Sequence, residues 1–389
     1  MSRMRLAIVG GALQGMEAVY LANKAGIETV VLDRKADAPA LSICDDPFVL
    51  DPTKDPESAM GIFEGCDAVI PACEELDLLH CLDGMLRDSD IPLLFDMHSY
   101  ETSCSKNRSN EIMESVGVPL PGKWPECGFP VIVKPSSQSG SIGVSVAFDQ
   151  DEVDRGLDVV RSLNDEPVIQ EFVHGKSVSI EVIGNGTTAR SFVTTEVVLD
   201  TNYDCKMVRC NPDIMSPEDD ELFGRIGRDV AESMGLSALM DVEAILTPKG
   251  LRVLEIDARI PSQTPAAIQA ATGVNLLEEL MFTALGKETG RARGDGSSVY
   301  RHVVMKDGVL RACGEKEFGH VRNPRLVKGF FGSDDAITDY EPGKSEWRAT
   351  LITSGRTEAE VDARCDSEIR RILDECSIEE FVDGSPEVV

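Results

Sequence analysis

The stretch MDVEAILTPKGLRVLEIDA, residues 240–258, predicts two antiparallel strands joined by a turn. Apolar residues alternate with polar ones on both sides of the turn TPKG (247–250). A strand places every second side chain on the same face, so each run carries two carboxylates on one face. These carboxylates are Asp241, Glu243, Glu255 and Asp257. If the turn pairs the two strands, the four carboxylates meet.

A cluster of carboxylates on neighbouring strands predicts a cation site. Like charges on adjacent strands repel one another unless a cation lies among them. Oxygen ligands without histidine or cysteine select Mg²⁺ over zinc. The alternative is a solvated acidic face, because the chain carries 68 Asp and Glu residues.

Three segments before these strands suit the phosphates of a nucleoside triphosphate. Lys106 lies on a polar helix, and Lys134 ends an apolar strand that is followed by the Ser/Gly-rich loop 136–144. Glu171-Phe172-Val173 ends a further strand. Two lysines can converge on phosphates as point charges, and a Ser/Gly loop can lay backbone N–H groups over the terminal phosphate. Alternatively, Lys134 is an edge residue and the loop has no ligand.

The first hundred residues predict a small open parallel sheet. Strands are expected at 5–10, 28–33, 66–71 and 91–96, with a helix between the first two and another between the last two. Asp33 lies about 20 residues after the glycine turn 10–15, where a dinucleotide-binding fold places a ribose ligand. A nicotinamide dehydrogenase is a weak alternative, because no downstream segment supplies a matching catalytic His, Lys or Tyr.

Beyond residue 100 the pattern is α+β rather than doubly wound. Segment 176–183 alternates, with Val178, Ile180 and Val182 on one face, and predicts a half-buried antiparallel strand. Helices are expected within 101–122, where Gly117 and Pro119 close the helix, near 151–163 and at 358–376. Further strands are expected at 129–135, 168–173, 240–246, 250–258, 298–304 and 347–352.

Composition excludes two classes of partner. The 389 residues include 38 Lys and Arg against 68 Asp and Glu, a formal net charge of −30. Nucleic acid is not expected as a partner, because neutralising phosphates takes clustered Lys and Arg. No membrane partner is expected either, since no apolar run approaches the roughly 18–20 residues of a membrane helix. We therefore expect a soluble, cytoplasmic protein of two or three domains.

Four features follow one another along the chain: Lys106, VIVKPSSQSGSIGV (131–144), IQEFVHGKSVSIEV (169–182) and MDVEAI…LRVLEIDARIPSQTP (240–265). This order resembles the ATP-grasp carboxylate–amine ligases. Three further motifs are GGALQGMEA (10–18), Tyr203-Asp204-Cys205 with Met207-Val208, and EIDARIPSQTP (255–265). With them, almost the whole chain resembles the family of ligases of pyrrolysine biosynthesis, which join 3-methyl-D-ornithine to the side-chain amine of L-lysine.

The resemblance implies an architecture. It is an ATP-grasp fold, α/β and α+β, with a Rossmann-like (pre-ATP-grasp) N-terminal domain at residues 1–100. The small ATP-grasp lobe is expected at 101–182. The large lobe, with the C-terminal strands and helix, is expected at 183–389. ATP is expected between the two ATP-grasp lobes, and a homodimer is allowed.

The resemblance also implies ligands for ATP and Mg²⁺. Lys106 and Lys134 bind phosphates, and the loop from Ser139 through Ser141 to Gly143 closes over them. Further nucleotide contacts are expected from Gln170, Glu171, Phe172 and Val173, which form a hinge beside adenine, and from Asp33. Glu243, Glu255 and Asp257 hold the magnesium. Two positions depart from the family pattern: Lys176 and Gln170 stand where glutamates are common.

The implied substrates are 3-methyl-D-ornithine, or D-ornithine, and L-lysine. The ornithine carboxylate attacks the γ-phosphate of ATP, and the ε-amine of lysine displaces phosphate from the resulting acyl phosphate. The expected catalytic residues are Arg259, Lys134 and Ser141. The expected substrate contacts are Leu13, Gln14, Glu74, Ser179, Ile180, Glu181, Arg259, Ser262 and Thr264. Another ATP-grasp amino-acid or dipeptide ligase and a nucleotide-binding regulator are the alternatives.

Overall fold

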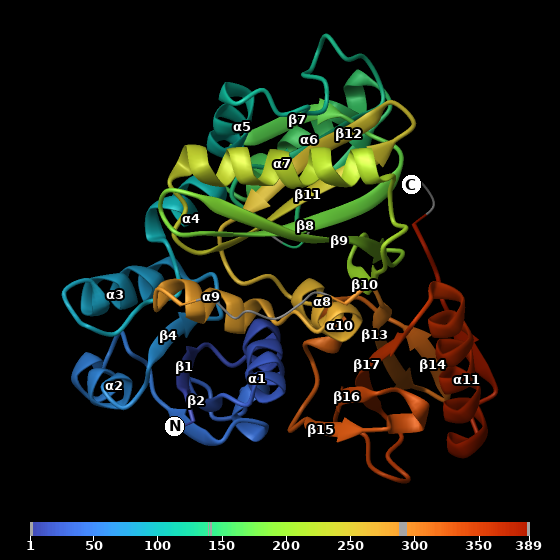
Figure 1. The fold of residues 1–389 in the computed structure, drawn as a ribbon. Coiled ribbons are helices and arrows are strands. Elements are labelled where there is room, and N and C mark those ends of the chain that lie inside the picture. The colour runs from blue at the N-terminus through green and yellow to red at the C-terminus, as the bar shows by residue number, and fades with distance from the viewer. Residues whose placement is uncertain (1–2, 139, 141, 288–293, 387–389) are drawn as a thin grey trace. The chain divides into compact units, whose positions relative to one another are not determined.

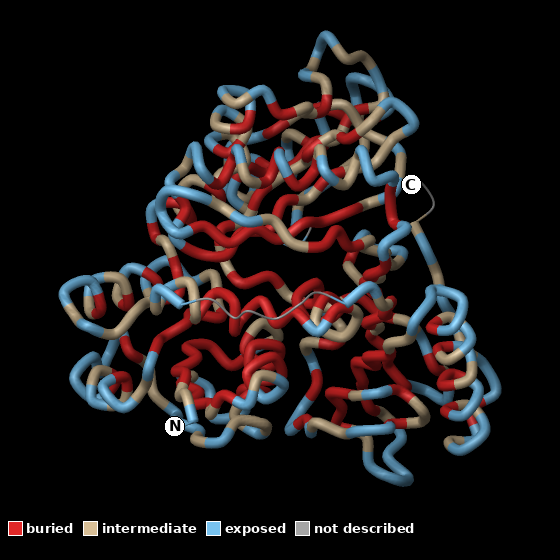
Figure 2. The backbone as a smooth tube through the Cα atoms, viewed as in Figure 1, coloured by how far each residue is buried: buried red, intermediate tan, exposed pale blue. Residues whose placement is uncertain are grey.

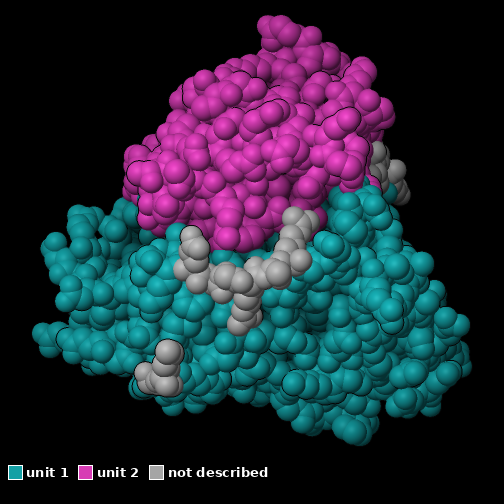
Figure 3. Space-filling view, in the orientation of Figure 1, with its two compact units in different colours: residues 1–97, 195–214, 260–387 teal, residues 98–194, 215–259, 388–389 magenta. Residues whose placement is uncertain are grey.

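The computed structural model describes residues 3–138, 140, 142–287 and 294–386. The chain forms two compact units (Figure 3). The first unit contains residues 1–97, 195–214 and 260–387, and the second unit contains residues 98–194 and 215–259. Buried residues concentrate in the strands and in the helices packed on them (Figure 2). None of the helices among the described residues is long and apolar enough to cross a membrane.

The N-terminal part of the first unit is a parallel four-stranded sheet, as predicted (Figure 1). The strand order is β3 (Asp46–Val49), β2 (Glu28–Asp33), β1 (Arg5–Val9) and β4 (Ala68–Pro71). Helix α1 (Leu13–Ala25) connects β1 to β2, α2 (Pro56–Phe63) connects β3 to β4, and α3 (Leu76–Leu86) follows β4. The sheet core consists of aliphatic residues with Phe63.

The prediction of a strand at 91–96 is wrong. Only one isolated parallel bridge, between Val69 and Leu93, joins this segment to β4. Val69 N donates to Pro92 O at 3.0 Å, and Leu94 N donates to Val69 O at 2.7 Å. Pro92 has no amide hydrogen, so the segment cannot continue a regular ladder of hydrogen bonds.

The rest of the first unit is mostly antiparallel. Its strand order after the end of β9 (Ala189–Leu199) is β10 (Cys205–Cys210), β13 (Ser297–Lys306), β17 (Trp347–Gly355), β16 (Asp335–Thr338) and β15 (Arg325–Lys328). β14 (Val309–Ala312) pairs with β13 and β18 (Glu380–Val382). The helices are η1 (Pro39–Ser42), α8 (Thr264–Thr272), α9 (Leu276–Ala284), α10 (Glu315–Phe318), η2 (Phe330–Gly332) and α11 (Glu358–Cys376). The predicted strands 298–304 and 347–352 and the helix 358–376 are confirmed.

The second unit contains two antiparallel layers. β6 (Ser145–Ala147), β5 (Val131–Pro135) and β7 (Pro167–Glu171) form one sheet, and α6 (Gln150–Ser162) packs on it. β12 (Gly250–Asp257), β11 (Leu239–Thr247) and β8 (Lys176–Gly184) follow one another in the second layer. Helix α7 (Pro217–Met234) lies on β8 so closely that a Cβ at Gly227 would come within 2.7 Å of Val182 Cγ2.

Two predictions for the second unit are wrong. The single helix expected within 101–122, closed by Gly117 and Pro119, is two helices, α4 (Met97–Ser103) and α5 (Lys106–Ser115). Ser105 caps the second helix, because its Oγ accepts from Arg108 N at 3.4 Å. Strand β8 is not half-buried: Ser179 is 2% exposed and Glu181 is 0% exposed. Its polar side chains alternate as predicted, but they are enclosed with other charged groups instead of facing solvent.

Candidate functional site

The carboxylates predicted on β11 and β12 meet in the second unit. The two strands pair antiparallel, with Asp241 opposite Asp257 and Glu243 opposite Glu255. We call these four residues the carboxylate cluster. The register shifts just after Glu243, which is a β-bulge. The pairing follows from the turn at 247–250, so local sequence was sufficient to bring the four carboxylates together.

Two lysines lie at the carboxylate cluster. Lys106 Nζ is 3.0 Å from Glu255 Oε2 and donates to Gln138 O at 2.9 Å. The backbone holds this lysine in place, because Lys106 N at the start of α5 donates to Ser136 O at 2.9 Å. Lys134 on β5 is 6% exposed. It is therefore buried and does not extend to solvent as an edge residue does.

The positive charges of the two lysines are distributed unevenly over the carboxylate cluster. Burial lowers the pKa of Lys134, and the charge of Glu255 only partly opposes this. Burial raises the pKa of Glu255, but the nearby charges of Lys106 and Lys134 outweigh it, so that pKa lies below its ordinary value. Burial, followed by the charges of Glu255 and Asp257, raises the pKa of Glu243 to about 8. The positive charges of Arg259 and Lys106 thus offset only part of the rise in the pKa of Glu243.

Arg259 holds two members of the carboxylate cluster in a fork. Its Nη1 is 3.2 Å from Asp241 Oδ1 and its Nη2 is 3.1 Å from Asp257 Oδ2. Burial raises the pKa of Asp241 well above its ordinary value, and the arginine works against that rise. A planar guanidinium suits two acceptors at once. The fork fixes the direction in which Arg259 presents its remaining donors.

The carboxylate cluster fits a hard divalent cation in part. Its donors are all oxygen, and Glu243 and Glu255 are cross-strand neighbours. Among the described residues, however, no group of three or more His, Cys, Asp or Glu side chains is gathered as a ready metal site. Mg²⁺ commonly takes one or two protein carboxylates and completes its shell with water and substrate phosphates. The assignment of Glu243, Glu255 and Asp257 to magnesium stays a prediction.

The predicted phosphate loop and adenine hinge are described in part. Ser139 and Ser141 lie outside the described residues. Gly143 has φ of +72°, and a Cβ there would come within 2.7 Å of Leu163 Cδ1, so this position needs glycine. In the hinge, Glu171 N donates to Gly122 O at 2.7 Å and Phe172 N donates to Pro130 O at 3.1 Å. These bonds anchor the hinge to the chain before β5.

The predicted substrate residues of the second unit lie beside the carboxylate cluster. β8 pairs with β11, which sets Ser179 opposite Glu243, Ile180 opposite Val242 and Glu181 opposite Asp241. Ser179 Oγ donates to Glu181 Oε1 at 3.5 Å. The charge of Glu181 also contributes to the raised pKa of Asp241, after burial and other neighbours. Sequence alternation had predicted the shared face but not its burial.

The predicted substrate residues of the first unit form two groups. Leu13 and Gln14 begin α1, and Gln14 Nε2 donates to Glu74 Oε1 at 3.3 Å. Ser262 and Thr264 flank Gln263, the N-cap residue of α8, and Thr264 is the first residue of that helix. Thr264 is 6% exposed, and within the described part of the chain its hydroxyl oxygen is buried without a hydrogen-bond partner. A buried hydroxyl in this state suits a ligand group.

Asp33 is engaged by the backbone around it. Its Oδ2 accepts from Gly11 N and its Oδ1 accepts from Lys35 N, each at 2.7 Å. Asp33 also lines a pocket of about 450 Å³ in the first unit, together with Gly10, Thr53 and Arg322. The hydrogen bonds give Asp33 a structural task in the glycine turn, and its predicted nucleotide contact stays a prediction.

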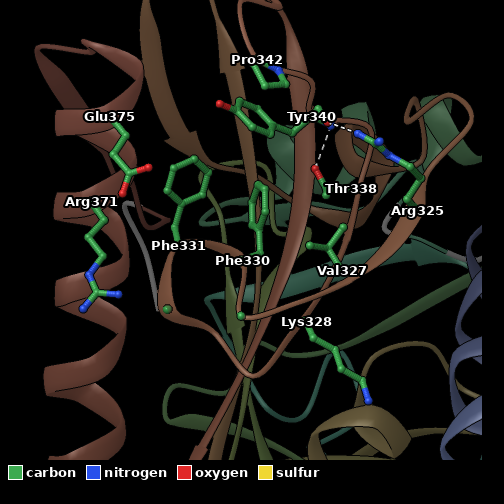
Figure 4. Close-up of a pocket in the computed structure, with 12 residues that line it drawn as sticks. Arg325, Val327, Lys328, Phe330, Phe331, Thr338, Tyr340, Pro342, Arg371 and Glu375 are labelled. Atoms are coloured by element: carbon green, nitrogen blue, oxygen red, sulfur yellow. Dashed lines mark hydrogen bonds between the residues drawn. The ribbon is translucent and has the colours of Figure 1, made fainter.

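A second pocket, of about 530 Å³, lies in the C-terminal part of the first unit (Figure 4). Phe330, Phe331 and Tyr340 line it with Arg325 and Arg371. The three rings contact one another edge to face, with centroids 4.6 to 5.5 Å apart. None of the predicted site residues lines this pocket. Phe330 belongs to the hydrophobic core of this region, and Phe331 and Tyr340 pack against that core.

Sequence reasoning missed several residues at these sites. Gln138 holds Lys106 through its carbonyl oxygen. Glu17 is 2% exposed and accepts hydrogen bonds from Tyr300 Oη and Gln263 N. One signal for Glu17 was available: it is an acid within the otherwise apolar run MEAVYLA of α1. A buried acid in such a position needs a partner, but the sequence does not say which.

Two segments of the chain match known family models. Residues 104–263 match the family model described as the ATP-grasp domain, and residues 6–94 match the PylC-like N-terminal domain. A 3-methyl-D-ornithine–L-lysine ligase of Methanosarcina barkeri is 37% identical over 80% of this chain and 83% of its own length. The ligase of the same name from Methanosarcina mazei is 34% identical over 92% of this chain and 93% of its own length.

A solved structure supports the fold. The biotin carboxylase domain of the Hydrogenobacter thermophilus 2-oxoglutarate carboxylase, a dimer in complex with MgADP, has a TM-score of 0.72 and 17% identity. The match covers 95% of this chain and 90% of that one. The predicted ATP-grasp fold and the resemblance in sequence are confirmed. The division at residues 100 and 182 and the individual site residues stay predictions.

Proposed function

This chain belongs to the family of the ATP-grasp 3-methyl-D-ornithine–L-lysine ligases, and we propose that it catalyses the reaction for which those relatives are named. It joins the carboxylate of 3-methyl-D-ornithine, or of D-ornithine, to the ε-amine of L-lysine in an isopeptide bond. ATP supplies the energy, and the amide forms through an acyl phosphate. This step belongs to pyrrolysine biosynthesis.

One observation supports the proposal most directly: Lys106, Lys134 and Arg259 gather at the partly buried carboxylate cluster. Phosphoryl transfer from ATP needs positive groups on the phosphates and carboxylates for a metal ion. Mg²⁺, when bound, offsets the charge of the phosphates. Glu243 and Glu255 are the residues that we propose to hold it, because they face each other and their donor atoms are oxygens.

The lysines have a defined task in this reaction. Lys106 pairs with Glu255 at 3.0 Å in the structure, so it neutralises a carboxylate that we assign to magnesium. If Glu255 held Mg²⁺, the metal would supply the counter-charge of this carboxylate, and Lys106 would then be available to a phosphate. Lys134 is buried beside the same carboxylates and contributes a second positive charge. Both lysines act by position and charge, not by proton transfer.

Arg259 is the residue that we propose to hold the reacting carboxylate. The fork to Asp241 and Asp257 occupies one oxygen of each acid and orients the guanidinium plane. An oriented guanidinium can stabilise the carboxylate before phosphorylation and the oxyanion that forms when the amine attacks. The acyl phosphate must be kept from water, a task that we assign to the loop 139–143.

Two basic substrates also need acidic partners. We propose that Glu181, which is fully buried, faces the ornithine side, with Ser179, Ile180, Ser262 and Thr264 as further contacts. Glu74, bonded to Gln14 in the first unit, is our proposed partner for L-lysine, together with Leu13. Charge-assisted hydrogen bonds of this kind are the stronger ones in proteins. A homodimer and a cytoplasmic location stay predictions from the sequence.

The experiment measures ADP and phosphate release from ATP with D-ornithine alone, L-lysine alone and both together. We expect full turnover only with both substrates, and its loss in Glu255→Gln. Asp220→Asn is a matched control, because Asp220 is an acid of the same unit that accepts from Thr194 Oγ1 at 2.6 Å, away from the carboxylate cluster. Turnover that is independent of both amino acids, or a fully active Glu255→Gln, would contradict the proposal.

A further inference from the structure

Three motifs that are far apart in the sequence converge on one residue, Gln263. The motif GGALQGMEA contributes Glu17, whose carboxylate accepts from Gln263 N. The motif with Tyr203-Asp204-Cys205 contributes Cys205, whose Sγ donates to Gln263 Oε1 and whose carbonyl accepts from Gln263 Nε2 at 3.4 Å. The third motif, EIDARIPSQTP, contains Gln263 itself. All three residues belong to the first unit.

Gln263 has a backbone conformation that ordinary residues avoid. Its φ is +71° and its ψ is −56°, directly before α8. A residue with a Cβ is strained in this region and persists only where its surroundings hold it. Here both ends of the residue are held, since Glu17 accepts from the amide while Cys205 binds the side chain. Gln263 is also 2% exposed, so water does not replace these partners.

Other groups complete the hold on this turn. Tyr300 Oη donates to the second oxygen of Glu17, so both carboxylate oxygens are used. Gln263 Nε2 donates to Glu315 Oε2 at 3.3 Å, and Ser262 Oγ donates to the same oxygen at 3.4 Å. Asp204 fixes the Glu315 segment, because its Oδ2 accepts from Lys316 N at 2.9 Å. The motif around Cys205 thus acts on the turn through both Cys205 and Asp204.

We infer that Glu17 is a positioning residue of the ligase, which holds the strained Gln263 turn and thereby places Ser262 and Thr264 against the ornithine substrate. The inference rests on the proposed function. Glu17 does not contact the substrate in this account. It acts through Gln263, and its effect reaches Thr264, whose buried hydroxyl has no hydrogen-bond partner within the described residues. The shape of this turn then determines which amino acid fits.

The test compares Glu17→Met with Glu368→Met. Met removes the acceptors in both cases but keeps most of the volume. Glu368 is a matched control, since it is 2% exposed like Glu17, lies in the same unit and accepts from Thr353 Oγ1 at 2.8 Å, with no bond to the Gln263 turn. The melting temperature and the KM values for ATP, D-ornithine and L-lysine are measured for each variant.

We expect Glu17→Met to raise the KM for D-ornithine about tenfold, the scale of removing one buried hydrogen bond, with less than about a twofold change for ATP. Glu368→Met lowers the melting temperature without moving any KM. Glu17→Gln keeps an acceptor, so its KM for D-ornithine stays within about threefold of the wild-type value. Tyr300→Phe, which removes one hydroxyl, serves as a milder variant if Glu17→Met does not fold, and raises the same KM.

Two outcomes overturn the inference, and they differ. A wild-type protein that shows no turnover with D-ornithine and L-lysine overturns the proposed function and the inference with it. An active wild type in which Glu17→Met and Glu368→Met have the same effects, or in which the D-ornithine KM stays unchanged in a folded Glu17→Met or Tyr300→Phe, overturns the inference alone.

Discussion

The substitution Glu17→Gln is expected to remove a pH dependence of stability from the first unit. Burial raises the pKa of Glu17 to about 8, from an ordinary value of 4.5, and the hydrogen bonds from Tyr300 and Gln263 offset only part of that rise. The charge of Glu315 adds to it. The folded protein therefore binds a proton at Glu17 that the unfolded chain releases at lower pH. Glutamine resembles the protonated acid and does not titrate.

The size of the effect follows from the two pKa values. A rise from 4.5 to about 8 corresponds to about 5 kcal/mol. Because the folded pKa is the higher one, this stabilisation is fully present below about pH 4.5 and is lost as the pH rises through about 8. Most of the loss, about 4 kcal/mol, falls between about pH 5 and 9. The wild type thus loses stability over this range relative to Glu17→Gln.

The assay is urea unfolding of both proteins at half-unit steps from pH 5 to pH 9. Other groups, such as Glu243 with its pKa near 8, titrate in both proteins and cancel in the difference. We expect the free energy of unfolding of the wild type, minus that of the variant, to fall steadily with pH. A difference that stays constant within about 1 kcal/mol would refute a protonated Glu17 and the burial argument behind it.

Three further predictions concern the reaction. Lys134→Met lowers the ligation rate roughly 10²-fold, because it deletes one charge at the phosphates, and an unchanged rate with saturating ATP would remove Lys134 from the site. Arg259→Lys keeps the charge but loses the fork to Asp241 and Asp257. The rate of D-ornithine-dependent ADP formation should therefore fall by more than any loss of folded protein explains. Equal rates of ADP formation in the variant and the wild type would contradict this. Glu74→Gln raises the L-lysine concentration needed for half-maximal rate about 10-fold or more and leaves D-ornithine use nearly unchanged, because it weakens a charge-assisted hydrogen bond to L-lysine alone. The reverse pattern for Glu74→Gln would mean that lysine is not bound in the N-terminal domain.

The local sequence pattern was sufficient to predict the structure wherever residues that are close in the chain are also close in space. The carboxylate cluster is such a case, because a short turn pairs β11 with β12 and strand period determines which residues face each other. Helix α11 begins and ends at the predicted residues, since Thr357 caps it and its apolar side chains recur at helical spacing. Motif order along the chain was likewise enough to predict the ATP-grasp fold.

The predictions from sequence were wrong where a local sequence pattern is compatible with two structures. The segment 101–122 has a continuous polar texture, but Ser105 competes for the backbone and starts a second helix. The segment 91–96 has the composition of a strand, yet Pro92 withholds the amide that a ladder requires. Polar and apolar residues do alternate along β8, but this alternation shows only that the two faces of the strand differ. It does not say that the polar face meets water.

By itself, the amino-acid sequence determined the family, the order of the lobes' motifs and the meeting of the carboxylates, because each depends on spacing along the chain. Only the tertiary structure decided which of the charged groups are buried and which distant residues touch. Glu17 and Gln263 are separated by 246 positions, and their hydrogen bond arises because α1 and α8 pack together in the first unit. Periodicity carries no information about a partner at that separation. Burial, which sets the pKa of Glu17 and of Glu243, is a property of the packed chain and of no single segment.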